Sequence, residues 1–129
     1  MIVVDTSALC AILFQEPGAD RFSEALALND AVIGAPNHFE FLMVATGRLR
    51  DKGPMQARAI TQSADLGVVA WDASLVDIAA EAFLHFGKGR NKAALNYGDC
   101  MAYALAKSLD APLLFKGNDF SLTDIKSAL

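Results

Sequence analysis

Four acidic residues occupy places in the sequence where a solvated surface charge is not expected: Asp5, Glu40, Asp99 and Asp119. Asp5 directly follows the apolar run Ile2-Val3-Val4, and Glu40 interrupts the apolar stretch from Phe39 to Ala45. The other two follow Asn96-Tyr97-Gly98 and the turn after Leu113-Leu114-Phe115. Acids are rarely buried unless they are paired or bound to a metal ion. The four positions therefore indicate a cation site.

A cluster of carboxylates is tolerated when a cation lies between them, because the like charges otherwise repel each other. An oxygen-only ligand set favours Mg²⁺ or Mn²⁺ over Zn²⁺, which is held mainly by nitrogen and sulfur ligands. Such a metal lowers the pKa of a bound water to make a nucleophile, and it stabilises negative charge on a phosphate. A four-acid site also suits a pair of metal ions roughly 3–4 Å apart, as in many nucleases. The predicted chemistry is metal-assisted phosphoryl chemistry.

Two of the acids also have a purely structural interpretation as helix-start residues. Asp5 is able to cap the helix that follows, although Thr6 and Ser7 are better placed to do so. Glu40 is expected in the first turn of its helix, where a negative charge suits the helix dipole. Its neighbours from Phe39 to Val44 are apolar and leave no polar face, which favours a buried role for Glu40.

The remaining two acids have structural interpretations as well. Asp99 follows Asn96 by three residues, which is the spacing of a capping box, although Asp is shorter than the usual Glu. Asp119 lies in Gly117-Asn118-Asp119, which has the composition of an ordinary turn. Both interpretations stay open on the sequence alone.

The elements that must position these acids alternate between short apolar strands and amphipathic helices. We expect strands at Ile2–Val4, Ala31–Ile33, Val68–Ala70 and Leu113–Phe115. We expect helices at Ser7–Phe14, Ala19–Leu28, Asn37–Arg50, Met55–Leu66, Ala73–Phe86 and Tyr97–Leu109, followed by a short ambiguous tail from Asp119 to Leu129. This alternation predicts an α/β fold with a parallel sheet covered on both faces. Because the carboxyl ends of parallel strands and the adjoining helix starts converge on one crevice, we expect all four acids to face one cleft.

The composition is that of one compact domain, which we take to span residues 1–129. The hydrophobic fraction of 53% and the mean hydropathy of +0.30 are high for a chain of this size. This excess indicates either a very large core or apolar surface that a partner covers. The net charge of −4 argues against a general polyanion binder, but it does not exclude nucleic acid held through a metal ion.

Cellular location is predicted from targeting signals and from cysteine usage. The N-terminus has no basic region before its apolar run, so we expect no signal peptide. No stretch approaches the roughly 18 apolar residues that span a bilayer. Cys10 and Cys100 lie in apolar helical patterns without metal-ligand spacing, which is typical of free thiols in a reducing compartment. We therefore expect a cytoplasmic protein with no membrane association.

The order of the acidic motifs resembles the PIN-domain pattern from one end of the chain to the other. The matching positions are Asp5-Thr6-Ser7-Ala8-Leu9, the mid-chain Glu40, Asp99 at a helix start and Asn118-Asp119-Phe120. Chain length and motif order are also similar to those of the VapC toxins of bacterial and archaeal VapBC toxin–antitoxin pairs. Within these, Phe86-Gly87-Lys88-Gly89-Arg90 and Leu95-Asn96-Tyr97-Gly98-Asp99-Cys100 resemble the corresponding segments of one VapC subgroup.

The resemblance implies a PIN-like three-layer α/β/α fold with a short parallel central sheet. It also implies a Mg²⁺-dependent endoribonuclease that acts as the toxin of a type II toxin–antitoxin system, with RNA as substrate and a cognate VapB-like antitoxin. The acids that it places at the centre of the site are Asp5, Glu40 and Asp99. Many relatives have a Thr after the fourth strand and an acid two residues later, but Phe115 and Gly117 stand at those places here. Only Asp119 remains for that part of the site, either as a direct ligand or through a water.

Several polar and basic side chains near the acids are candidates for substrate contacts: Thr6, Ser7, Lys88, Arg90, Lys92 and Lys116. Thr6 or Ser7 fits a hydrogen bond to a metal-bound water or a phosphate oxygen, but either fits a helix cap equally well. The three basic residues before Asp99 fit positioning contacts with RNA phosphates or, alternatively, a solvated loop. Lys116 fits either a phosphate contact or neutralisation of the acids.

Three functions compete for this sequence. The leading one is the metal-dependent endoribonuclease, neutralised by an antitoxin whose amphipathic helix fits a groove between helices, with a further patch for a homodimer. The alternative is a catalytically silent PIN-like module that only binds RNA or a protein, which the missing Thr and the missing acid near Asp119 favour. A phosphohydrolase with an aspartyl nucleophile is less consistent, since such enzymes commonly need a second acid where this chain has Ser7.

Overall fold

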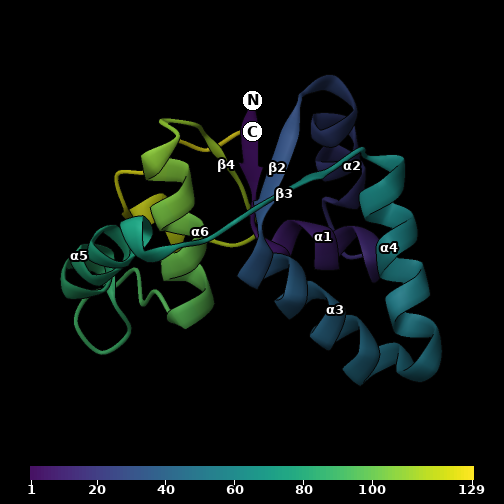
Figure 1. The fold of residues 1–129 in the computed structure, drawn as a ribbon, viewed down its shortest axis with the longest axis horizontal. Helices are drawn as coiled ribbons and strands as arrows, with labels where there is room; N and C mark the ends of the chain where they lie inside the picture. Colours follow the sequence, from purple (N-terminus) through teal and green to yellow (C-terminus); the bar gives the residue numbers. More distant parts are fainter.

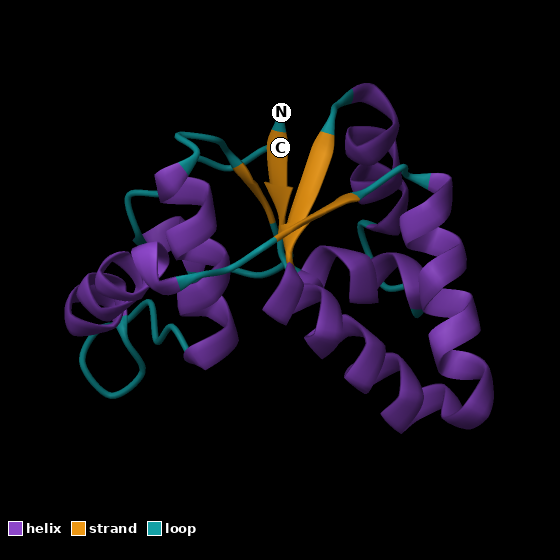
Figure 2. Ribbon diagram, viewed as in Figure 1, coloured by secondary structure: helices purple, strands orange, loops and turns teal.

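A computed structural model describes all residues from Met1 to Leu129 and arranges them in three layers. The middle layer is a four-stranded parallel sheet in the order β3-β2-β1-β4. Its strands are β1 (Ile2–Val4), β2 (Ala31–Gly34), β3 (Gly67–Val69) and β4 (Leu113–Leu114). The helices are α1 (Thr6–Leu13), α2 (Ala19–Leu28), α3 (Ala35–Leu49), α4 (Gly53–Ser63), α5 (Val76–Phe86) and α6 (Tyr97–Ser108). Figures 1 and 2 show α1 to α4 on one side of the sheet and α5 and α6 on the other.

The central strand β1 is buried on both of its faces. Ile2 and Val4 point into the hydrophobic core formed with α1 to α4, whereas Val3 points into a second core formed with α5 and α6. β4 repeats this alternation, with Leu114 in the first core and Leu113 in the second. Two-sided burial explains why these strands are continuous apolar runs in the sequence. The predicted three-layer α/β/α architecture with a short parallel sheet is confirmed.

Several helix starts differ from the prediction, and two of the differences concern the acids. α4 spans Gly53–Ser63 rather than the expected Met55–Leu66, because Pro54 fits its first turn. α1 begins at Thr6 and is capped by Asp5, whose side chain accepts the Ser7 N–H, so the expectation that Thr6 or Ser7 would cap it is wrong. α3 begins two residues earlier than expected, because Pro36 fits the first turn, where its missing N–H is not needed. Glu40 therefore lies in the second turn of α3, and its expected place in the first turn is wrong.

Smaller differences concern the third strand, the fifth helix and the tail. β3 is shifted by one residue to Gly67–Val69, and the start of the expected fifth helix is a 3₁₀ turn at Ala73–Leu75. The ambiguous tail contains a 3₁₀ turn at Phe120–Leu122. Beyond that turn, Ser127 forms a parallel bridge with Leu113 at the outer edge of the sheet. The tail thus extends the sheet, which its short and mixed sequence does not predict.

Two further expectations concern thiols and membrane segments. Cys10 is half-buried and Cys100 is buried, and both are free thiols as expected. None of the helices combines the length and the apolar character needed to cross a bilayer.

Candidate metal centre

The carboxyl edge of the sheet brings the four predicted acids together. Asp5 ends β1, and its N–H donates to Leu114 O of β4 over 2.9 Å. Glu40 is carried by α3, which follows β2, while α6 carries Asp99 and packs against β1, β2 and α3. Burial is the main cause of the raised pKa of Asp5, and the negative charges of Asp99 and Glu40 raise it further. Burial is also the main cause of the raised pKa of Asp99. The hydrogen bond from the Asn96 N–H lowers this pKa, and the charges of Asp119 and Glu40 raise it.

Asp5 is the most deeply buried of these acids, with 4% of its surface exposed. Its Oδ2 accepts the Ser7 N–H at 3.0 Å, which satisfies one donor at the start of α1. Burial raises the pKa of Asp5 from 3.8 to about 7, and the hydrogen bonds from Ser7 offset only part of that shift. None of the ion pairs of the molecule includes Asp5. A buried carboxylate without a counter-charge is costly, so this position favours a bound cation.

Asp99 forms a reciprocal capping box with Asn96 at the start of α6. The Asp99 N–H donates to Asn96 Oδ1 at 2.9 Å, and the Asn96 N–H donates to Asp99 Oδ2 at 3.0 Å. The capping interpretation is therefore correct for Oδ2 of Asp99, which caps the start of α6. Oδ1 of Asp99 and Oδ1 of Asp5 accept no hydrogen bond from the protein. Each of these two carboxylates keeps one oxygen for a ligand while the other holds a helix start in place.

Glu40 is half-buried and lies directly against the first turn of α6. A Cβ atom at position 98 would come within 2.7 Å of Glu40 Oε2, so any larger residue there would displace the Glu40 carboxylate. Since Gly98 is the residue before Asp99, the glycine leaves room for the Glu40 carboxylate next to the Asp99 segment. Sequence reasoning missed Gly98, although a glycine directly before a candidate metal ligand is a detectable signal.

Asp119 lies in the loop after β4 and is exposed. It precedes the 3₁₀ turn at Phe120–Leu122, but its side chain makes no capping hydrogen bond there. The turn interpretation therefore does not account for its carboxylate. Burial is the main cause of the raised pKa of Asp99, and the charge of Asp119 raises that pKa further. Of the four acids, Asp119 is the one most accessible to solvent.

Three of the predicted substrate contacts are occupied by bonds within the protein. Thr6 Oγ1 is buried and donates to Asn37 O at 2.9 Å. Ser7 Oγ accepts the N–H of Lys116 at 3.0 Å, and Lys116 Nζ lies 3.1 Å from Glu16 Oε1. These bonds tie the start of α1 to α3 and to the loop that carries Asp119.

The basic loop after α5 is exposed, as a surface for phosphate contacts requires. Lys88, Arg90 and Lys92 are all exposed, and the Arg90 Nε–H donates to Leu84 O at 3.2 Å. Residues 89–92 line a shallow surface pocket together with Leu122, which follows Asp119 in the tail. The loop and the Asp119 segment therefore share one stretch of surface.

The side chains at this edge fit a hydrated Mg²⁺ or Mn²⁺ ion. All candidate ligand atoms are carboxylate oxygens, and Asp5 and Asp99 each present a free oxygen. No three His, Cys, Asp or Glu side chains are gathered tightly enough to enclose an ion by themselves. Mg²⁺ commonly keeps several waters and binds through one or two carboxylates, so a closed protein cage is not required.

Comparison with known proteins gives one family for nearly the whole chain. Residues 2–126 match the family model of the PIN domain. A Ribonuclease VapC of Mycolicibacterium smegmatis is 43% identical over 126 residues, which cover 96% of this chain and 97% of that protein. Ribonuclease VapC30 of Mycobacterium tuberculosis is 41% identical over 125 residues, covering 96% of this chain and 95% of that protein.

Among solved structures, VapC20 of Mycobacterium tuberculosis, described as a Sarcin-Ricin loop cleaving toxin, superposes with a TM-score of 0.77. The match covers 97% of this chain and 96% of that chain at 19% sequence identity. At that identity the likeness shows the fold, and the fold is the same three-layer arrangement.

The raised pKa of Asp5 predicts how pH changes the stability of the metal-free protein. Because the folded chain holds the Asp5 proton up to about pH 7 and the unfolded chain releases it near 3.8, the free energy of unfolding falls as pH rises between these values. Asp5→Asn keeps the N-cap and cannot ionise. It should be more stable than the wild type by roughly 4 kcal/mol at pH 8, with a smaller advantage at pH 5.

Urea unfolding in EDTA at both pH values measures this difference, with Asp51→Asn, an exposed acid in the turn after α3, as the control. A stability difference for Asp5→Asn that is the same at both pH values would contradict the assigned burial of the Asp5 charge.

Proposed function

The chain belongs to the PIN-domain family, together with the VapC ribonucleases, and from this premise we propose that it is a Mg²⁺- or Mn²⁺-dependent endoribonuclease. In this proposal it is the toxin of a type II toxin–antitoxin pair and acts in the cytoplasm, where its RNA substrate and its antitoxin are made. The observation that carries the proposal is the meeting of acids from β1, α3, α6 and the loop after β4 at one edge of the sheet.

Each acid has a distinct part in the proposed site. Asp5 and Asp99 would hold the metal directly, since each has one carboxylate oxygen without a protein partner. Glu40 would add negative charge to the metal site from its position next to Gly98. The exposed Asp119 would bind the metal either directly or through a water. A bound Mg²⁺ would lower the pKa of a water and stabilise charge on the attacked phosphate.

The substrate contacts in this proposal come from exposed basic groups rather than from the buried hydroxyls. Arg90 and Lys92 line a surface pocket with Leu122 of the Asp119 segment, and together with the neighbouring Lys88 they would position RNA phosphates. Thr6, Ser7 and Lys116 would act on the substrate only indirectly, because their hydroxyls and ammonium already bond to protein groups.

The rival proposal is a silent PIN-like module that binds RNA or a protein without cleavage. The absence of a Thr and of a second acid near Asp119 favours it, since Phe115 and Gly117 stand at those places. The free carboxylate oxygens of Asp5 and Asp99 favour the enzyme, because a binding module has no need of converging acids. RNA cleavage by the purified chain separates the two.

Cleavage should require a divalent metal and should depend on Asp99. Asp99→Asn keeps a side-chain oxygen that accepts the Asn96 N–H, so α6 should stay capped while the metal loses a charged ligand. We expect its cleavage rate to fall by more than the roughly 10–100-fold typical of changes outside the ligand shell. RNA cleavage with Mg²⁺, with Mn²⁺ and with excess EDTA measures the effect, and Asp51→Asn is the matched control.

The products should carry a 3′-hydroxyl and a 5′-phosphate. Water then adds to phosphorus, the bond from phosphorus to the 3′ oxygen breaks, and that oxygen takes up a proton. A 2′,3′-cyclic phosphate, cleavage that survives EDTA, or full activity of Asp99→Asn would each rule out the proposed site.

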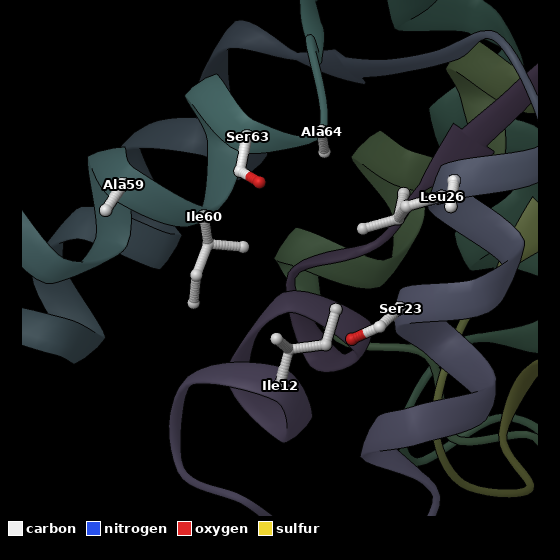
Figure 3. A pocket seen from close by; sticks show the side chains of 8 residues that line it. Ile12, Ser23, Leu26, Ala59, Ile60, Ser63 and Ala64 are labelled. Atoms are coloured by element: carbon white, nitrogen blue, oxygen red, sulfur yellow. The ribbon is translucent and has the colours of Figure 1, made fainter.

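The antitoxin, in this proposal, lies in a groove of about 380 Å³ between α1, α2 and α4. Figure 3 shows Ile12, Leu26 and Ile60 pointing toward this groove from the three helices. Small side chains such as Ala59 and Ser63 leave room for an amphipathic helix to approach closely.

The same groove is connected to the acids through α1. Asp5 caps this helix, and Ile12 lies about 10 Å further along its axis at 1.5 Å per residue. An antitoxin segment leaving the groove along α1 would therefore bring a basic side chain to the carboxylates. Such a side chain would offset their repulsion and compete with metal and RNA.

Filling the groove should separate antitoxin binding from catalysis. Ala59→Trp should weaken antitoxin binding about tenfold or more, because forcing extra bulk into a packed interface costs roughly 1–3 kcal/mol. Its RNA cleavage should be unchanged, since α4 contributes none of the acids. Titration of the cleavage reaction with the antitoxin from the adjacent gene measures both. Gln62→Trp, exposed on α4 but outside the groove, is the control, and equal inhibition of all three proteins would exclude this groove.

A homodimer is the last part of the proposal, and its support is an exposed apolar face over α3, α5 and α6. Phe39, Met43, Phe83 and Tyr97 are large and exposed on this face. Two adjoining cavities there, of about 420 and 460 Å³, share Trp71, Tyr97 and Met101 as lining residues. A mass in solution of twice 13.7 kDa would support the dimer, and a mass of 13.7 kDa would exclude it.

A further inference from the structure

Asn37 is a buried amide at the junction of the three segments that carry the central acids. It lies in the first turn of α3 with 1% of its surface exposed. Its carbonyl oxygen accepts the hydroxyl of Thr6, the residue after Asp5, at 2.9 Å. Its side-chain Nδ2 donates to Gly98 O, in the residue before Asp99, at 3.1 Å.

The position of Asn37 on α3 relates it to Glu40 as well. The two residues are three apart on one helix, so their side chains project from neighbouring turns of the same face. Both reach Gly98: the Asn37 amide donates to its carbonyl oxygen, and the Glu40 carboxylate occupies the space that a side chain at position 98 would take. The Asn37 bond therefore ties α3 to the first turn of α6 beside Asp99, at the place where the Glu40 carboxylate also approaches α6.

The side chain of Asn37 is poorly suited to a role in packing alone. Its Oδ1 is buried and has no hydrogen-bond partner. A buried acceptor without a partner costs free energy that an apolar side chain of the same size would not incur. The bond from Nδ2 to Gly98 O is thus the contribution that distinguishes this amide from a leucine.

We propose that Asn37 is a positioning residue for the metal centre, which it serves by setting the separation of the Glu40 and Asp99 carboxylates through Gly98. This inference rests on the proposed metal-dependent nuclease. Asn37 contacts neither the metal nor the RNA, and its effect reaches them through the placement of α6 relative to α3. Misplacement of a metal-binding or reacting group by about 1 Å is enough to reduce turnover strongly.

The test replaces the amide with an apolar side chain of nearly equal size. In Asn37→Leu, Mn²⁺ affinity measured by calorimetry should fall about tenfold or more, the scale seen for groups that orient metal ligands. The kcat for Mn²⁺-supported RNA cleavage should fall while KM for RNA stays near the wild-type value. The melting temperature in EDTA should not fall, because the variant also removes the unpartnered oxygen.

Asn29→Leu is the matched control. The Asn29 Nδ2 also donates to a backbone carbonyl, that of Ala25 at 2.8 Å, but this bond lies before β2 at the opposite edge of the sheet. Asn29→Leu should leave Mn²⁺ affinity and kcat unchanged.

Thr6→Val provides a second variant in case Asn37→Leu folds poorly, since it removes the bond to Asn37 O with little change in shape. It should also lower Mn²⁺ affinity.

Wild-type Mn²⁺ affinity and kcat in the folded variants overturn the inference while leaving the nuclease proposal intact. Mn²⁺ binding without any RNA cleavage by the wild type removes the nuclease proposal, and loss of binding in Asn37→Leu would then still support the role of Asn37. A wild type that binds no Mn²⁺ removes both.

Discussion

The burial of carboxylates beside one another is the constraint around which the carboxyl edge of this sheet is built. Burial and the neighbouring acids together raise the pKa of Asp5 and of Asp99, so the metal-free edge holds negative charge at a cost. The protein does not neutralise this charge itself, because Lys116, the basic residue bonded to the start of α1, pairs with Glu16. The surrounding hydrogen bonds therefore keep the acids close despite their repulsion, and in the proposed function a divalent cation supplies the counter-charge.

The acids of the two central segments also stabilise the fold without a metal, because they cap the helices that follow them. Asp5 starts α1 and Asp99 starts α6, each through one oxygen, which leaves the other oxygen free. The two hydrophobic cores on either face of the sheet hold β1 and β4 in register, so the loops that follow them emerge side by side. Helix capping and the proposed metal ligation are thus compatible uses of the same carboxylates rather than competing explanations.

Much of the fold and the identity of the acids could be predicted from the sequence, because strands buried on both faces leave continuous apolar runs and acids stand out against them. Helix starts were less predictable: Asp5 rather than Thr6 or Ser7 caps α1, and Pro36 moves the start of α3 ahead of Glu40. The contacts of Gly98 could not be predicted, since they join it to residues 61 and 58 positions away and exist only after α3 and α6 pack. The pairing of Ser127 with the sheet edge is hidden for the same reason.

The central claim is that the acids of this edge bind one divalent cation site, and calorimetric titration of the metal-free protein with Mn²⁺ tests it most directly. The account predicts saturable binding by the wild type, with affinity reduced at least about tenfold in Asp5→Asn and in Asp99→Asn and unchanged in Asp51→Asn. Wild-type affinity in both Asp5→Asn and Asp99→Asn, or no binding by the folded wild type, would contradict it.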